Sequence, residues 1–103
     1  VAKGVGITPF HAMLDTARQR SVLMEATLIE VGNSSESLYP ELSSIRGVTR
    51  VLVESLDELA SALPDEPVSW SGVSGSPTFV RDARKALASA GYRSVDTDRF
   101  IGY

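Results

Sequence analysis

Short apolar runs alternate with helical patterns along the chain, and this alternation constrains the fold more than any other feature. Runs typical of strands are expected at residues 1–2, 26–31, 50–54, 68–74 and 93–97. Amphipathic helical patterns lie between them, at residues 9–20, 39–45, 56–63 and 77–90. Such alternation implies parallel strands with helices on both faces. We therefore expect an α/β fold, a three-layer doubly wound domain with a five-stranded parallel sheet of order 3-2-1-4-5.

Local start and stop signals support three of the helices. The first has Thr8 as its expected N-cap and Pro9 as its first residue. The third follows a capping-box pattern at residues 55–58. The last is opened by the turn at residues 75–77, with Gly91 expected as its C-cap. Apolar faces at helical spacing in the first and last helices comprise Phe10, Met13, Leu14 and Ala17, and Phe79, Ala83, Leu87 and Ala90.

Composition limits the classes of function. The 103 residues, 43% of them hydrophobic, suit one domain with a single core. A net charge of -3, with scattered basic residues, argues against nucleic-acid binding, which needs clustered Lys and Arg. No cysteine is present and His11 is the only histidine, so we expect no metal site of the usual zinc type. No apolar run approaches the length of a membrane span, so a soluble, cytoplasmic domain is expected.

Two turns at the carboxyl ends of predicted strands carry unusual residues. The first is Gly4-Val5-Gly6-Ile7-Thr8-Pro9 and the second is Ser74-Gly75-Ser76-Pro77, and each directly precedes a helix. Glycine permits a tight turn and a close approach of the backbone. The free N–H groups and dipole of the following helix favour an anion such as a pyrophosphate. In the expected strand order, strands one and four are neighbours, so both turns should converge on one cleft at the switch point.

Glycines at tight strand-to-helix turns also occur in α/β folds without a nucleotide. The first turn departs from the dinucleotide fingerprint G-x-G-x-x-G, because Pro9 stands where the third glycine would be. Spacing alone therefore leads only to a phosphate-binding α/β domain. Two other residues have structural interpretations: we expect His11 on the surface of a helix near the mouth of the cleft, with a minor phosphate contact as the alternative, and Trp70 in the core.

Three ordered motifs resemble those of the ferredoxin–NADP reductase superfamily. Residues 1–10, VAKGVGITPF, resemble the G-[IV]-G-I-T-P motif that opens the pyridine-dinucleotide domain of that family. Residues 74–80, SGSPTFV, are similar to its later [CS]-G-P-P-x-F-V motif. Residues 97–103, TDRFIGY, resemble the closing T-[DE]-x-F-x-G-Y of several members. The resemblance implies an NAD(P)-binding domain over residues 1–103.

The resemblance implies chemistry shared between two domains. In such enzymes hydride passes from NAD(P)H to FAD, and electrons leave to an iron–sulfur protein, a haem or another acceptor. A flavin-binding barrel is therefore expected upstream as a partner, with a first strand truncated in this chain, since only two residues precede Lys3. Without the flavin domain we expect the isolated chain to be inactive. A membrane-anchored parent would place the domain on the cytoplasmic side.

The resemblance also assigns candidate site residues. Those expected to hold the pyrophosphate are Gly4, Val5, Gly6, Ile7, Thr8 and Pro9. Gly32 and Asn33 would border the adenine ribose. The nicotinamide ribose would lie against Ser74, Gly75, Ser76 and Pro77. Ser74 and Tyr103 are the candidate catalytic residues, with Tyr103 against the flavin ring.

The chain departs from the family pattern at three positions, and these departures leave an alternative open. Ser74 stands where many members have cysteine, Ser76 replaces the first proline of the second motif, and Lys3 stands where glycine is frequent. The domain could accordingly be a non-catalytic regulatory or docking module that retains the nucleotide-binding fold.

The segment after the second strand bears on the choice between NAD and NADP. NADP-binding domains usually place an Arg near the adenine ribose to contact the 2′-phosphate. Residues 32–36 offer no basic side chain, and Glu36 would repel a phosphate. This favours NAD, although Arg46 or Arg50 could fold back toward the ribose.

Overall fold

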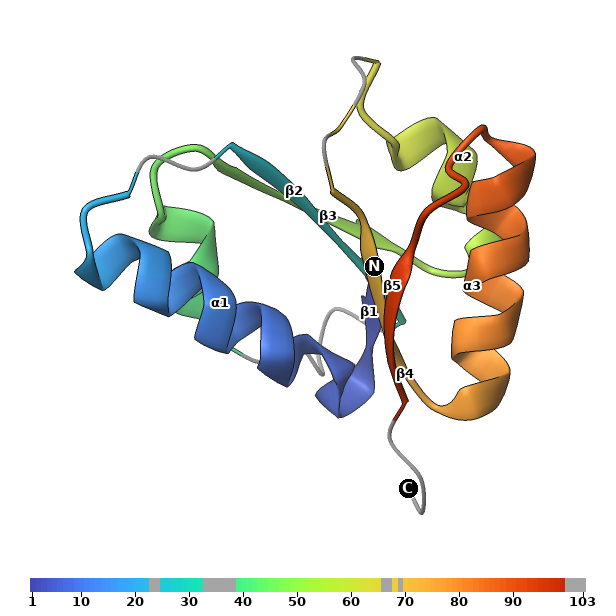
Figure 1. Cartoon of the computed structure of the whole chain (residues 1–103), viewed down its shortest axis with the longest axis horizontal. Coiled ribbons are helices and arrows are strands. Elements are labelled where there is room, and N and C mark those ends of the chain that lie inside the picture. Colours follow the sequence, from blue (N-terminus) through green and yellow to red (C-terminus); the bar gives the residue numbers. More distant parts are fainter. Residues whose placement is uncertain (23–24, 33–38, 66–67, 69, 100–103) are drawn as a thin grey trace.

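Five parallel strands form a single sheet in the computed structural model, which describes residues 1–22, 25–32, 39–65, 68 and 70–99. The strand order is β3-β2-β1-β4-β5 (Figure 1). The strands are β1 (Ala2–Lys3), β2 (Ala26–Val31), β3 (Val48–Val53), β4 (Gly72–Gly75) and β5 (Asp96–Arg99). Every pair of neighbouring strands runs parallel. The predicted α/β doubly wound fold, with strand order 3-2-1-4-5, is thus confirmed.

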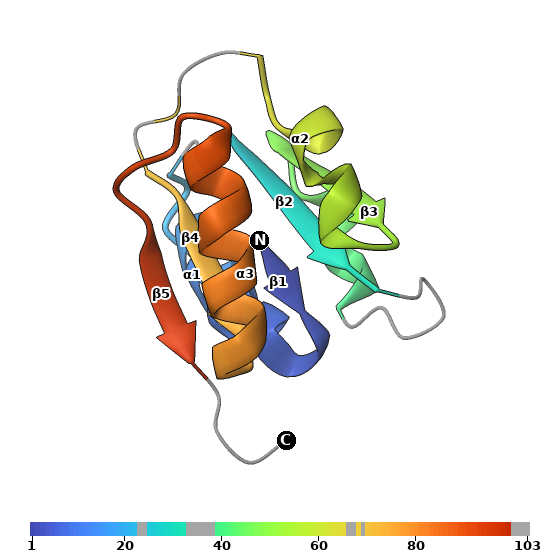
Figure 2. The ribbon, with the colours of Figure 1, turned by 90° about the vertical axis from the view of Figure 1, so that its right-hand side faces the viewer.

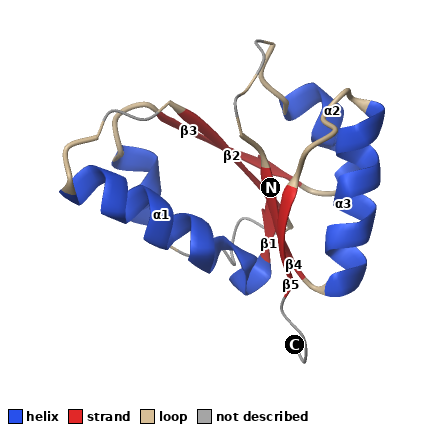
Figure 3. Ribbon diagram, viewed as in Figure 1, coloured by secondary structure: helices blue, strands red, loops and turns tan. Residues whose placement is uncertain are grey.

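Helices cover both faces of this sheet. The helix α1 (Thr8–Gln19) lies on one face, and α2 (Leu59–Ala62) and α3 (Pro77–Ser89) lie on the other. Figure 2 shows α3 in front of the sheet and α1 behind it, and Figure 3 shows the same layers coloured by secondary structure. Three 3₁₀ helices complete the described elements: η1 (Gly4–Ile7), η3 (Pro40–Ser44) and η4 (Leu56–Glu58).

Each face of the sheet has its own apolar core. On the α1 side, Phe10 and Leu14 pack with Leu28 of β2 and with Leu42 of η3. On the α3 side, Val80 and Leu87 are fully buried and belong to a larger cluster with Ile29, Val31, Val53, Leu59 and Val73. Complete burial of one such aliphatic side chain stabilises the fold by about 1.5–3 kcal/mol. The alternation of β2 residues between the two clusters explains why its sequence is almost continuously apolar.

The boundaries of α3 follow the local signals in its sequence. The Ser76 hydroxyl accepts a hydrogen bond from the Phe79 N–H at 3.2 Å, as expected of an N-cap. Gly91 has a φ of 99°, which favours glycine, and the next N–H, of Tyr92, donates to the Leu87 carbonyl at 2.9 Å. The predicted start of this helix is confirmed, whereas its C-cap is Ala90, and Gly91, predicted as the C-cap, is the residue after it.

Other predicted boundaries were wrong. Thr8 is the first residue of α1 and Ile7 occupies the N-cap position, because the preceding glycines themselves wind into η1. The helix predicted from Tyr39 to Ile45 is the shorter η3, preceded by Tyr39 in the left-handed region at φ 54°. In the third helix, the Ser55 side chain makes no cap hydrogen bond, and the Glu58 carboxylate accepts from the Glu54 N–H instead.

The strand predicted at residues 68–74 begins only at Gly72. Trp70, expected in the core, is 48% exposed and lies before the strand. Its indole N–H donates to the Asp96 carboxylate at 2.6 Å, and its ring packs edge-on against Phe10 with the ring centroids 6.3 Å apart. The prediction that Trp70 is buried in the core was wrong, because its indole N–H is hydrogen-bonded to Asp96 at the edge of the sheet.

Two further strands are shifted from their predicted bounds: β3 covers Val48–Val53 where residues 50–54 were expected, and β5 covers Asp96–Arg99 where residues 93–97 were expected. Among the described residues, no helix combines the length and apolar character needed to cross a membrane.

Candidate functional site

The two glycine turns meet at the carboxyl edge of the sheet. β1 and β4 are neighbours, with Ala2 opposite Ser74, so the segments that follow them emerge side by side. A Cβ on Gly6 would lie 2.4 Å from the Ser74 carbonyl oxygen and 3.1 Å from the Gly75 Cα. The predicted convergence of the turns is therefore present in the fold. It also explains why residue 6 is a glycine, since only glycine permits backbone contact this close.

The amino terminus of α1 lies at this junction. No side chain caps it, no acidic residue occupies its first turn, and Pro9 stands within its first two positions. The N–H groups at the start of a helical segment carry partial positive charge. Here η1 runs directly into α1, so the first turn of that segment is η1 itself. Thr8 is exposed at the same end, and Lys3, also exposed, ends β1 just before the turn. The charge distribution here therefore favours an anion.

The second turn is built differently. The Ser76 hydroxyl already caps α3 through the Phe79 N–H. A Cβ on Gly75 would lie 2.6 Å from a ring carbon of Phe79, so this glycine makes room for the buried ring. Gly75 and Ser76 thus shape the start of α3, and a ligand would meet a helix terminus that is already partly satisfied. Pro77 is the first residue of that helix.

Ser74 is the least satisfied polar residue described at the junction. It lies at the carboxyl half of β4, is 1% exposed, and its N–H donates to the Val1 carbonyl at 3.0 Å. Its Oγ is buried without a hydrogen-bond partner within the described part of the chain. A buried hydroxyl without a partner costs free energy, and such groups in native proteins call for an explanation. A polar ligand at the junction would supply the missing partner if η1 or Gly75 moved to expose it.

The end of β2 supplies the third predicted part of the site. Gly32 has a φ of 140°, in the region that favours glycine, and its N–H donates to the Val53 carbonyl at 2.9 Å. It therefore turns the chain at the same carboxyl edge as Gly6. Asn33 and Tyr103, which were also assigned to the site, lie outside the described residues, as does Glu36, which was expected to repel a 2′-phosphate.

A buried ion pair that we did not predict lies between β2 and β3. Arg50 donates to both Glu30 carboxylate oxygens, at 2.8 and 2.7 Å, and to the Tyr39 carbonyl at 2.7 Å. Its side chain is 9% exposed and that of Glu30 is 12% exposed. The sequence signal was Glu30 itself, since a carboxylate inside an apolar strand needs a cation. Because the guanidinium is engaged in this way, Arg50 is not the side chain to fold back toward a ribose phosphate.

His11 is engaged as well. Its ring stacks on Tyr39 with centroids 3.8 Å apart, and its Nε2 lies 3.2 Å from a carboxylate oxygen of Glu41. The nearby carboxylate makes a phosphate contact by His11 unfavourable. The expected position on a helix surface is closer to the observed one, since the imidazole is about a quarter exposed.

The fit of a dinucleotide can be judged from these features. An uncapped helix terminus and an adjacent cation suit the pyrophosphate, and the orphaned Ser74 Oγ is a donor that a polar ligand could use. The described residues of the first turn are thus compatible with a phosphate group, whereas in the second turn the Ser74 hydroxyl is buried and the Ser76 hydroxyl already caps α3. Within the described chain, no group of three His, Asp or Glu side chains is placed to hold a metal ion.

Comparisons with known proteins add no relative. No protein-family model, no curated protein and no solved structure matches this chain.

Proposed function

We propose that this chain is an NAD(P)H-binding domain of a flavin-dependent oxidoreductase of the ferredoxin–NADP reductase type. The observation that carries the proposal is the meeting of the two glycine turns at the switch point, beside the uncapped amino terminus of α1. The three motif resemblances support the same assignment. The proposal places the domain in the cytoplasm, with an upstream flavin-binding domain as its partner.

In this proposal the backbone of Gly4–Thr8 binds the pyrophosphate through N–H groups, and Pro9 holds the first turn of α1. The turn Ser74–Pro77 borders the nicotinamide ribose, and Gly32 borders the adenine ribose. The nucleotide supplies a hydride, which FAD accepts before electrons leave to an iron–sulfur, haem or other acceptor. This chain's part is to bind and orient the nucleotide, with Tyr103 against the flavin.

The ion pair of Arg50 supports NAD over NADP as the cofactor. A 2′-phosphate needs an available guanidinium or ammonium group near the adenine ribose. Arg50, on the strand next to β2, already binds Glu30 through two hydrogen bonds. Arg46, which is exposed, remains the other basic side chain named for such a contact. With Arg50 engaged, we expect NADH to bind at least as tightly as NADPH.

Binding is tested by titrating the protein with NADH, NADPH and ADP-ribose, followed by calorimetry and by amide chemical shifts. We expect shifts confined to the turns at the carboxyl edge, which are residues 4–8, Gly32 and residues 74–76. The variant Thr8→Asp places a carboxylate in the first turn of α1, where the helix dipole tolerates it but a pyrophosphate does not. Affinity should fall about tenfold or more, corresponding to about 1.4 kcal/mol.

Thr16→Asp is the matched control, since Thr16 is exposed near the other end of the same helix. It should leave the affinity for NADH unchanged. An absence of shifts at millimolar NADH, or an equal loss in both variants, would count against the cofactor assignment.

The docking-module alternative is favoured by the state of two serines. The Ser74 hydroxyl is inaccessible at 1% exposure, and the Ser76 hydroxyl is used as a helix cap. Neither hydroxyl is therefore available to contact a nicotinamide in this structure. The two functions are separated by joining the chain to a flavin-binding domain and measuring NADH-dependent ferricyanide reduction. Turnover with bound flavin would exclude the docking function, whereas flavin binding without turnover would support it.

A further inference from the structure

A network of side chains and backbone links several elements on the α1 face of the sheet. Arg50 of β3 donates two hydrogen bonds to the Glu30 carboxylate of β2 and a third, at 2.7 Å, to the carbonyl of Tyr39. Tyr39 directly precedes η3, and its ring stacks on that of His11, which lies in the first turn of α1. The network therefore joins β2, β3, η3 and α1 at one residue, Tyr39.

The backbone of Tyr39 is in the left-handed region, with φ 54° and ψ 61°. A residue with a Cβ avoids this region unless the surrounding structure enforces it. Within the described chain, Ser21 is the other non-glycine residue with a positive φ, and it follows the end of α1, where a left-handed residue commonly ends a helix. Tyr39 ends no helix, so its conformation has another cause.

Several contacts hold Tyr39 in this conformation. Its carbonyl accepts hydrogen bonds from the Leu42 N–H at 3.0 Å and from Arg50 at 2.7 Å. The His11 ring covers one face of the Tyr39 ring, with the centroids 3.8 Å apart. The carboxylate of Glu41 in η3 lies 3.2 Å from Nε2 of that imidazole. Both the backbone and the ring of Tyr39 are therefore fixed in place.

The buried ion pair provides geometry more than stability. The side chains of Arg50 and Glu30 are 9% and 12% exposed, so both charges have lost most of their hydration. Apolar side chains of similar size commonly stabilise a fold at least as well as such a pair. A guanidinium, however, has several donors in a fixed plane. Arg50 uses Nε and Nη2 for Glu30 and Nη1 for Tyr39, which an apolar pair cannot do.

The network lies between two parts of the proposed nucleotide site. Glu30 stands opposite Ala2 of β1 in the sheet register and two residues before Gly32. His11 follows Thr8 by three residues, so it belongs to the turn that begins α1. The ion pair and the ring stack therefore connect the carboxyl end of β2 with the amino terminus of α1.

The chain that follows β2 is attached to β3 on both sides of residues 33–38, which themselves lie outside the described part of the chain. Before them, the Gly32 N–H donates to the Val53 carbonyl at 2.9 Å. After them, the Tyr39 carbonyl accepts from Arg50. The position of Tyr39 relative to Gly32 thus depends on the Arg50 side chain.

We propose that Glu30 and Arg50 are positioning residues for the adenosine side of the nucleotide site. The inference rests on the proposed function, which places the adenine ribose beside Gly32. Neither side chain contacts the nucleotide, because both are buried and act through Tyr39. Their effect is to order this side of the site before binding, which lowers the entropic cost of binding. The nicotinamide side, at residues 74–77, does not depend on them.

The test uses the double variant Glu30→Leu/Arg50→Met, which removes the hydrogen bonds but keeps the space filled and should retain the stability of the fold. Its affinity for NADH in calorimetry should fall about tenfold. The amide shifts that NADH causes should diminish at Gly32 and persist at Gly75, whereas a merely structural role would affect both turns alike. Arg84→Met is the matched control, since Arg84 is exposed on α3, and it should leave affinity and shifts unchanged.

The unchanged protein is measured first. If it binds neither NADH nor ADP-ribose, the proposed function fails and this inference fails with it. If it binds, and the double variant binds equally or loses the shifts at Gly32 and Gly75 alike, the inference alone is overturned. Arg50→Lys keeps the charge without the planar set of donors, and it gives the same readouts should the double variant be unstable by urea denaturation. If neither variant folds, the pair is a requirement of the fold and the inference is overturned.

Discussion

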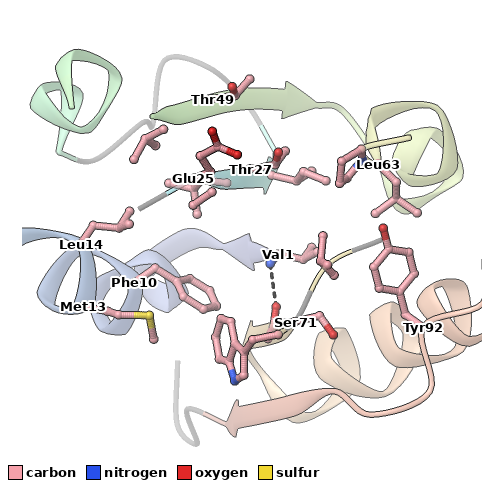
Figure 4. Close-up of a pocket in the computed structure, with 18 of the residues that line it drawn as sticks. Val1, Phe10, Met13, Leu14, Glu25, Thr27, Thr49, Leu63, Ser71 and Tyr92 are labelled. Atoms are coloured by element: carbon pink, nitrogen blue, oxygen red, sulfur yellow. Dashed lines mark hydrogen bonds between the residues drawn. The ribbon is translucent and has the colours of Figure 1, made fainter. Parts of the chain in front are cut away.

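The two edges of the sheet differ in how closely the chain approaches itself. At the carboxyl edge, η1 and the end of β4 are so close that Gly6 has no room for a Cβ. At the amino edge, the Val1 amine lies beside β4 and donates to the Gly72 carbonyl at 2.8 Å (Figure 4). The same neighbouring strands therefore present a close backbone contact and helix termini at one end and a buried amine at the other.

The two edges also differ in whether their buried polar groups have hydrogen-bond partners and carry charge. At the carboxyl edge the Ser74 hydroxyl is buried without a partner within the described residues. At the amino edge the Val1 amine has its partner, the Gly72 carbonyl, but carries a charge that burial disfavours. Removing the hydroxyl and removing the charge should therefore both stabilise the fold, by different amounts and with different pH dependence.

The largest effect is expected at the amino edge, from the Val1 amine. Burial lowers the pKa of this amine from 8.0 to about 5, so the unfolded chain binds more protons between these pH values. Stability should therefore rise as pH increases from 5 to 8, by up to about 4 kcal/mol from this group. Acetylation of the Val1 nitrogen should remove this contribution. Urea denaturation of the free and acetylated proteins across this range measures it.

Only the difference between the two proteins reports on Val1, since other groups titrate identically in both. Parallel pH profiles for the free and acetylated proteins would show that the amine reaches water in the fold. That outcome would also weaken the contrast between the two edges.

A somewhat smaller effect is expected at the carboxyl edge from Gly6→Ala. The added Cβ would meet the Ser74 carbonyl at 2.4 Å, and backbone on both sides must shift to relieve the clash. Overpacking of this kind destabilises by about 1–3 kcal/mol, and we expect the upper end because both partners are backbone. The denaturation midpoint measures it. Thr8→Ala, at an exposed neighbouring position, should change stability little, and equal midpoints for both variants would refute the close contact.

The smallest effect is expected from Ser74→Ala. Deleting a buried hydroxyl that has no partner should raise the free energy of unfolding by about 1 kcal/mol. If the hydroxyl serves a bound nucleotide, the same variant should weaken NADH binding while it stabilises the free protein. Denaturation and NADH titration of one preparation give both numbers. A loss of stability would mean that the hydroxyl has a partner in the folded chain.

Much of the fold was predictable because it depends on local patterns. The alternation of apolar runs and helical patterns predicted five strands and their order, and the turn that opens α3 at Ser76 was confirmed. The convergence of the two glycine turns followed from that order. The exact limits of the strands and the burial of single side chains were less predictable. Trp70 illustrates this, since it lies before β4 and its indole N–H donates to Asp96, which is distant in the sequence.

The amino-acid sequence by itself determined the parallel sheet and which turns lie at its switch point, because periodicity and capping act over a few residues. Only the tertiary structure decided how tightly those turns meet, that Ser74 is buried, and that Arg50 is held by Glu30. These features depend on distances between backbones brought together by strand order, and side-chain spacing along the chain carries no measure of such distances.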